Sequence, residues 1–439
     1  MISQKDKALA QYILKFAQQN GCWASRVALY AGTERSFEFR DRQLEKLHQA
    51  SENRLSVSLF VDGRYGTCST NRMDKSEVEK LIINAIQSTR YLSQEPCRTL
   101  PQVERYYKGG GAPDLLFDQT IETINTDDKL LIIKATVDEV YQTDPRIIMV
   151  SAGYGDSTHF SYLIDSNGFE GEQAQTNFNL SASVSLKDIG DERPESWWYD
   201  SSLFWDKLQK TGIGKKALER ALRKLGQQKI ASGRYPMVVE NIMASNLLSP
   251  ILSAINGNAL AQKDSFLMHK LGKKVASEKL TLIDDPHLPN AMGNRRFDNE
   301  GVAATKRMVI QNGVLQTYYI DTYNAHKMKV SPTISGASVL TFEQGDKDLN
   351  GLISSFDRGI LVTGFNGGNC NSSTGDFSFG VEGFLVENGE MIKPISEMNI
   401  TGNMLTLWER LVAVGNDALD NSAWRTPSLV FDGVAFSGL

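Results

Sequence analysis

The hydrophobic pattern at the start of the chain predicts two helices around a hairpin. Apolar residues recur at helical spacing between Ser3 and Gly21, two residues suited to begin and end a helix. Alternating residues predict strands at 26–30 and 55–61, and Asp62-Gly63 supplies a two-residue hairpin turn. A second amphipathic helix is expected after Asp74.

The pattern continues beyond a segment rich in proline and glycine. Residues 93–117 are expected to form a connection because they contain these breakers and lack periodicity. A third helix is predicted at about 127–141, and strands at 147–153, 160–164 and 178–186.

A polar segment and a series of turn signals mark the rest of the chain. Residues 188–200 are expected to be a loop before a cationic helix at about 215–226, and a buried strand is expected at 235–240, followed by a Leu- and Ile-rich helix. Three Asx-Gly pairs lie between apolar alternations and predict tight turns: Asn312-Gly313, Asn388-Gly389 and Asp432-Gly433.

These elements predict an α+β fold, in which N-terminal mixed α/β portions precede a β-rich, largely antiparallel C-terminal domain. The expected division is an N-terminal helix/hairpin/helix domain at 1–92, a linker at 93–117, a middle α/β segment at 118–230 and the β-rich domain at 231–439.

Composition narrows the class of protein. The 439 residues carry a net charge of -5, and the only dense basic stretch has helical spacing, so no direct contact with nucleic acid is expected. The N-terminus lacks an apolar signal region, and no uncharged apolar run is long enough to cross a membrane. Together with four scattered cysteines, these features predict a cytoplasmic protein.

A self-contained active site is not visible. The closest two of the five histidines, His269 and His287, are too far apart in sequence for an HExxH zinc motif on one helix. Cys370 lies in a Gly/Asn/Ser-rich loop that invites a catalytic thiol, although a plain loop cysteine is the favoured interpretation. A site assembled from distant residues stays open. These observations assign this chain no catalytic residue and no metal ligand.

A series of spaced motifs nevertheless resembles the TldD/PmbA family, whose members are also called modulators of DNA gyrase. The motifs cover nearly the whole chain: V-D-G-R-Y-G at 61–66, R-F-D-N-E-G-V at 296–302, Y-I-D-T-Y-N-A at 319–325, T-G-D-F-S-F-G at 374–380 and I-T-G-N at 400–403.

The resemblance is to the PmbA/TldE branch of that family. In the TldD branch, a helix carries H-E-x-x-x-H and a C-terminal cysteine completes a zinc site. Here Ser249 and Pro250 stand at the first His and the Glu, Ala254 stands near the second His, and residues 422–428 contain no cysteine. Pro250 is also expected to disrupt a continuous helix unless it begins one. The resemblance therefore implies no cofactor in this chain and zinc in a partner subunit.

What the resemblance implies is a non-catalytic subunit of a cytoplasmic complex. A TldD-like zinc metallopeptidase subunit would cut peptides, and this chain would help to enclose a chamber that admits unfolded or extended peptides. Gyrase would then be modulated indirectly, through the peptides that are processed. Thr374, Gly375, Asp376 and Phe377 are candidates to line the chamber, or else form a turn that serves only the fold.

Two alternatives stay open. The chain could be a regulatory protein that binds gyrase-related targets without proteolysis, or a stand-alone hydrolase that needs no metal. Because a subunit built for a partner keeps an apolar surface, the isolated chain is expected to form a homodimer.

Overall fold

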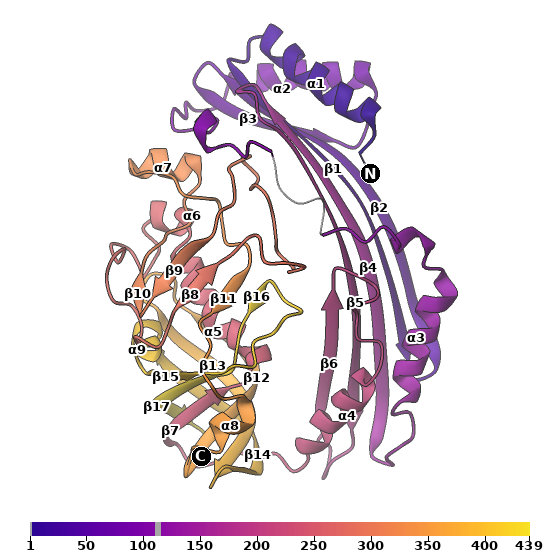
Figure 1. Ribbon diagram of the computed structural model, residues 1–439, viewed down its shortest axis with the longest axis vertical. Helices are drawn as coiled ribbons and strands as arrows, with labels where there is room; N and C mark the ends of the chain where they lie inside the picture. Colours follow the sequence, from indigo (N-terminus) through magenta and orange to yellow (C-terminus); the bar gives the residue numbers. More distant parts are fainter. Residues whose placement is uncertain (1, 110–115) are drawn as a thin grey trace.

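A long antiparallel sheet of six strands forms one side of the molecule (Figure 1), in the order β3-β2-β1-β4-β5-β6. The computed structural model describes residues 2–109 and 116–439. The strands are β1 (Ala24–Arg40), β2 (Gln43–Val61), β3 (Arg64–Thr70), β4 (Ile147–Asp165), β5 (Glu170–Leu186) and β6 (Glu195–Ser202). The strands expected at 26–30 and 55–61 are thus much longer, and those expected at 147–153 and 160–164 are one strand.

Four helices cover one face of this sheet. In β1 the odd-numbered residues carry that face: Val27 and Leu29 pack under α1 (Gln4–Gln19) and α2 (Lys75–Thr89). Further along the same strand, Phe37 and Phe39 pack under α3 (Thr126–Asp138) and α4 (Ile213–Arg223). The side chain of Ser3 accepts a hydrogen bond from the Asp6 backbone at 3.1 Å, which confirms the predicted cap of α1.

The loop expected at 188–200 is wrong, because its second half is strand β6. Strand β6 pairs with β5 along its whole length, from Glu195 opposite Ser185 to Ser202 opposite Phe178. Trp198 is half-buried and packs against the core beneath α4, so pairing with β5 and this aromatic contact outweigh the polar composition of the segment.

The C-terminal part contains two sheets. In the larger one, the order β14-β13-β12-β7-β17-β15 is joined by an additional β14–β17 pairing, so five of its strands close on themselves. Its strands are β7 (Gly233–Val239), β12 (Arg358–Cys370), β13 (Asp376–Glu387), β14 (Glu390–Asn403), β15 (Leu411–Val414) and β17 (Leu429–Ser437). The smaller sheet, β10-β9-β8-β11-β16, comprises β8 (Leu282–Asp284), β9 (Arg307–Gln311), β10 (Val314–Leu315), β11 (Leu340–Phe342) and β16 (Trp424–Arg425).

Short helices connect these strands, and the mixture confirms the α+β class. They are α5 (Asn241–Ala254), α6 (Gly257–Ala261), α7 (Thr322–Met328), α8 (Leu349–Ile353) and α9 (Met404–Glu409). Most pairings are antiparallel, as expected, whereas β7–β12 and β11–β16 are parallel. In the described residues, no helix is long and apolar enough to span a membrane.

Three of the four predicted Asx-Gly turns are confirmed, and one is wrong. Asp62-Gly63, Asn312-Gly313 and Asn388-Gly389 all have positive φ and join neighbouring antiparallel strands. Asp432-Gly433 instead lies inside β17, where the pairing with β7 shifts register. Gly433 has a φ of +59°, so the pair forms a bulge that bends one strand rather than a turn between two.

The predicted connection at 93–117 contacts both the long sheet and the C-terminal part, although its residues 110–115 lie outside the described residues. Tyr106 donates a hydrogen bond to Asp165 at 2.5 Å, and the Tyr107 backbone donates to the Gly301 carbonyl at 3.0 Å. At the other end of the molecule, Arg220 of α4 holds Glu240 with two hydrogen bonds of 2.6 and 2.7 Å. Because one sheet runs through both 1–92 and 118–230, the division between them stays a prediction.

Candidate functional site

Helix α5 carries Ser249, Pro250 and Ala254, the positions that the resemblance matches to the zinc-binding helix of the TldD branch. It runs without a break from Asn241 to Ala254 with Pro250 inside it, so the expected disruption of the helix is wrong. Proline cannot donate to the carbonyl of Asn246 four residues earlier, which weakens the helix locally. Leu248 before Pro250 and Ile251 after it are both buried, so packing against the C-terminal core holds the helix together.

The residues at these positions do not fit a zinc ion. Zinc in proteins takes Cys, His, Asp or Glu ligands, and the side chains of Ser249, Pro250 and Ala254 offer none of these. Ser249 is exposed, whereas Ala254 is buried and its carbonyl accepts a hydrogen bond from Ser265 at 2.6 Å. Over residues 2–109 and 116–439, no three His, Cys, Asp or Glu side chains gather closely enough to hold a metal ion.

Residues 422–428, the C-terminal segment without a cysteine, contain side chains that hydrogen-bond the first residue of α5. Thr426 donates a hydrogen bond to the Asn241 carbonyl at 2.8 Å, and the Ser428 hydroxyl accepts one from the Asn241 backbone at 3.2 Å. Ser428 in turn donates to the Asp417 carboxylate at 2.7 Å. This segment therefore stabilises a helix terminus.

The predicted chamber residues form a tightly bonded turn before β13. Thr374 donates a hydrogen bond to Asp376 at 2.7 Å, and the Asn403 side chain donates to the same carboxylate at 2.9 Å. These two donors hold the pKa of Asp376 below its usual value. Thr374 and Asp376 are exposed, whereas Gly375 and Phe377 are buried. The exposed pair is thus available to a ligand, and the buried pair serves the fold.

The structure brings the turn and α5 together through a short connector, residues 264–266. Ser265 binds the Ala254 carbonyl, while the Phe266 backbone donates to the Ser372 carbonyl at 2.9 Å. A Cβ atom added to Gly375 would lie 3.0 Å from the Phe266 ring, so the ring packs directly on this glycine. We call the C-terminal half of α5, the connector and residues 371–377 the α5–turn surface.

The α5–turn surface carries groups suited to binding rather than to covalent chemistry. Its accessible side chains are hydroxyls, amides, the half-buried carboxylate of Asp264 and the exposed carboxylate of Asp376. Cys370 lies beside it, but burial and the nearby Asp376 charge raise the pKa of its thiol. A catalytic cysteine needs a lowered pKa, so the geometry favours a cysteine without a catalytic role. The expected loop position is wrong, because Cys370 is the last residue of β12 and pairs with Phe377 of β13.

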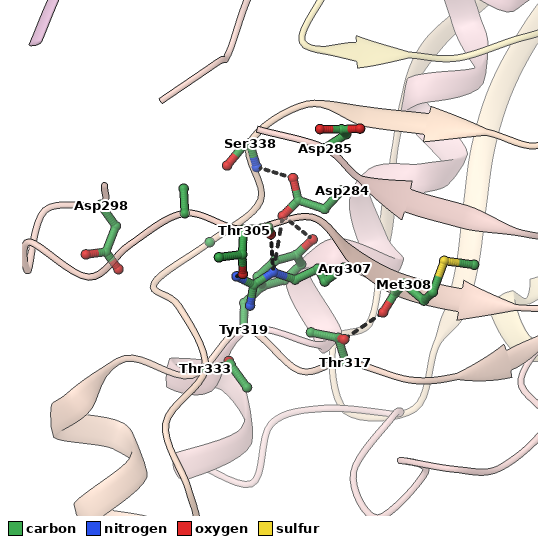
Figure 2. Close-up of polar contacts among 12 residues, drawn as sticks. Asp284, Asp285, Asp298, Thr305, Arg307, Met308, Thr317, Tyr319, Thr333 and Ser338 are labelled. Carbon is green, nitrogen blue, oxygen red and sulfur yellow. Dashed lines mark hydrogen bonds and ion pairs between the residues drawn. The ribbon is translucent and has the colours of Figure 1, made fainter. Parts of the chain in front are cut away.

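A buried polar cluster in the smaller sheet was not predicted. Figure 2 shows Asp284, Arg307 and Tyr319 pointing toward one another. Asp284 is 1% exposed and accepts hydrogen bonds from the Ser338 backbone at 3.0 Å and from the Tyr319 hydroxyl at 3.1 Å. Arg307 lies 4.0 Å from the same carboxylate. Burial raises the pKa of Asp284, because the low-dielectric interior disfavours its charge.

The buried polar cluster connects separate segments of the chain and so stabilises the fold. Asp298, also buried, accepts hydrogen bonds from the backbone amides of Glu300, Val302 and Ser335 at 2.9–3.0 Å. The two aspartates thereby tie 284, 298–302 and 335–338 to one another. Asp298 lies in the R-F-D-N-E-G-V motif at 296–302, whereas nothing in the local sequence marks Asp284 because its partners are far away in the chain.

Comparison with known proteins identifies the family. Three domain models match the chain: PmbA/TldA metallopeptidase domain 1 at 26–89, the central domain at 119–225 and the C-terminal domain at 232–438. A solved structure from Bacteroides thetaiotaomicron, described as a candidate modulator of DNA gyrase, is 56% identical over the whole of both chains, with a TM-score of 0.98. The chain belongs to the PmbA/TldD family.

Relatives in other organisms agree with the branch that the motifs resemble. The Metalloprotease PmbA homolog of Haemophilus influenzae is 27% identical, over 99% of this chain and 96% of that protein. Metalloprotease PmbA of Escherichia coli is 26% identical over 94% and 92%. The structure of TldE from Thermococcus kodakarensis shares the fold, with a TM-score of 0.84 at 21% identity over 98% of this chain and 100% of that chain.

Proposed function

We propose that this PmbA/TldD-family chain is a zinc-less, non-catalytic subunit that works beside a zinc-bearing, TldD-like metallopeptidase in the cytoplasm. The observation that carries the proposal is the chemistry of α5. The helix that would carry H-E-x-x-x-H is intact, yet it presents Ser249, Pro250 and Ala254 in those places. Family membership supplies the peptidase context, and the lack of zinc-ligating side chains at these α5 positions supports the placement of zinc in a partner chain.

In this proposal the partner subunit binds zinc and cleaves the peptide, and the two chains together enclose the substrate. The α5–turn surface is the part of this chain that lines the chamber, through the exposed Thr374 and Asp376. Hydroxyl, amide and carboxylate groups can hydrogen-bond an extended peptide backbone without reading its sequence. That chemistry suits unfolded peptides of varied sequence. Any effect on DNA gyrase would follow from the peptides that the complex removes.

The decisive experiment is co-expression with a TldD-like protein from the same organism. The proposal expects a stable complex that cleaves an unfolded peptide and loses activity with EDTA, while this chain alone cleaves nothing. A variant of the partner with its HExxxH glutamate changed to glutamine should assemble but remain inactive, which separates assembly from catalysis. Failure of the two chains to assemble, or EDTA-resistant cleavage by this chain alone, would contradict the proposal; the latter result supports the metal-free hydrolase.

The contribution of the α5–turn surface can be measured in that same complex. Thr374→Val removes the hydroxyl but adds no bulk, and Thr374→Ser keeps the hydrogen bond to Asp376. We expect the valine variant to raise the KM for peptides and the serine variant to resemble the wild type. Equal KM values for both variants would show that this turn does not contact the peptide.

A further inference from the structure

The outer edge of β2 is open over much of its length. Residues 43–54 pair with β1 on one side, and all twelve are exposed. On the other side β3 pairs only with Leu55–Val61, since it ends at Thr70 opposite Leu55. A surface hollow of about 380 Å³ lies at this step, lined by residues 51–54 and 69–71. A further strand could therefore continue along β2 where β3 stops.

This edge keeps the features that favour pairing. An edge strand presents a row of backbone donors and acceptors to any added strand. The pairing with β1 is regular from Lys46 onward, because the register shift falls at Glu45. The segment also contains no proline. Leu47 is 58% exposed on the helix-bearing face, so an apolar side chain lies beside the open backbone without cover.

The charge pattern indicates which strand fits. A two-fold axis perpendicular to the sheet would place β2 antiparallel to its own copy. Side chains directly opposite each other must then lie on the same face, so their residue numbers add to an even total. An axis through Gln49 places Lys46 opposite Glu52 of the second copy, and the symmetry repeats this pair.

Neighbouring registers are worse. An axis through Ala50 would place Lys46 opposite Arg54 of the second copy, which is a repulsive pair. An axis through His48 would place Lys46 opposite Ala50, leaving its charge without a partner. The register centred on Gln49 is thus selected by charge, and it also uses the middle of the open edge.

We propose that residues 46–52 of β2 pair with the same residues of a second copy of this chain, with the axis at Gln49, to join the two long sheets. This contact gives a surface to the self-association expected of the isolated chain. It requires no zinc-bearing subunit, so it stands or falls separately from the peptidase proposal.

A charge-swap series tests both the surface and the register. Lys46→Glu alone and Glu52→Lys alone each create two like-charge pairs, and each should weaken the dimer by about tenfold or more. The double variant restores opposite charges and should return the dissociation constant to within about threefold of the wild type. Sedimentation equilibrium of the full chain over micromolar concentrations measures these constants. Glu77→Lys and Lys80→Glu change an exposed pair on α2 and serve as matched controls with no expected effect.

Cross-linking provides an independent readout. Gln49→Cys places two thiols opposite each other at the axis, within the Cα separation that a disulfide spans. Oxidation should then give a covalent dimer that reductant reverses, whereas Ala50→Cys and the wild type should not. A monomeric wild type would overturn the contact. So would a dimer that all the charge variants leave unchanged and that Gln49→Cys does not cross-link; in that case the chain associates through another surface.

Discussion

Replacing Gly375 by alanine tests the packing of the α5–turn surface. Gly375 has a φ of +78°, a conformation that costs a residue with a Cβ about 1–2 kcal/mol. The new Cβ would also lie 3.0 Å from the Phe266 ring, and overpacking of this kind costs about 1–3 kcal/mol. The two terms together predict a loss of about 2–5 kcal/mol in the free energy of unfolding.

The chain offers a matched control in Gly367. Its φ is +75°, but a Cβ there would meet no atom within 4 Å. Gly367→Ala should therefore lose only the backbone part, about 1–2 kcal/mol. The entropy that alanine removes from the unfolded chain is the same in both variants and cancels in the comparison.

Urea denaturation of both variants, followed by circular dichroism, measures the difference. Adding Phe266→Leu to the Gly375→Ala variant should recover part of the loss, because the smaller side chain can move away from the new methyl group. If Gly375→Ala is no less stable than Gly367→Ala, the Phe266 contact is not rigid, and the connector does not hold the turn against α5.

Three further predictions follow from the described contacts. Protein purified without chelator should contain far less than one zinc per chain by elemental analysis, and one zinc per chain would refute the assignment of α5. Asp298→Ala should cost about 3 kcal/mol or more in urea denaturation by leaving three backbone amides without their acceptor, whereas Asp298→Asn should cost less. Burial raises the thiol pKa of Cys22 and of Cys68 to about 11, so both thiols should resist thiol reagents at pH 8 and react faster as the pH rises toward 11. Folding stability should fall over pH 9–11, because in that range the unfolded chain releases the two thiol protons and the folded chain keeps them. Rapid labelling at pH 8, mapped by mass spectrometry, would contradict this prediction.

Local signals in the sequence predict local structure well. Asn312-Gly313 needs only its own backbone preferences to form a turn, and it forms one. Asp432-Gly433 carries the same signal, but β7 pairs with the residues on both sides of it, and this distant strand converts the turn into a bulge. The polar middle of β1 shows no alternation of apolar residues, and it becomes strand because β2 and β4 pair with it on both sides.

The same distinction holds for the candidate site. The positions that lack zinc ligands are visible in the sequence because they follow one another along a single helix, α5. The Phe266–Gly375 contact and the Asp284–Tyr319 pair join residues that are far apart in the chain. Neither has a spacing that a sequence pattern could reveal, so both required the fold.

The pairing of β1 with β4 determines when the long sheet can form during synthesis. Strand β1 acquires β2 at once, but its other neighbour begins only at Ile147. A nascent chain of about a hundred residues would thus expose the backbone of β1 to any passing strand. A truncated version ending within 93–117 would keep the same bare edge permanently. A truncated chain meant to be stable should instead end between α4 and β7, at residues 224–232, because all six strands of the long sheet precede that point.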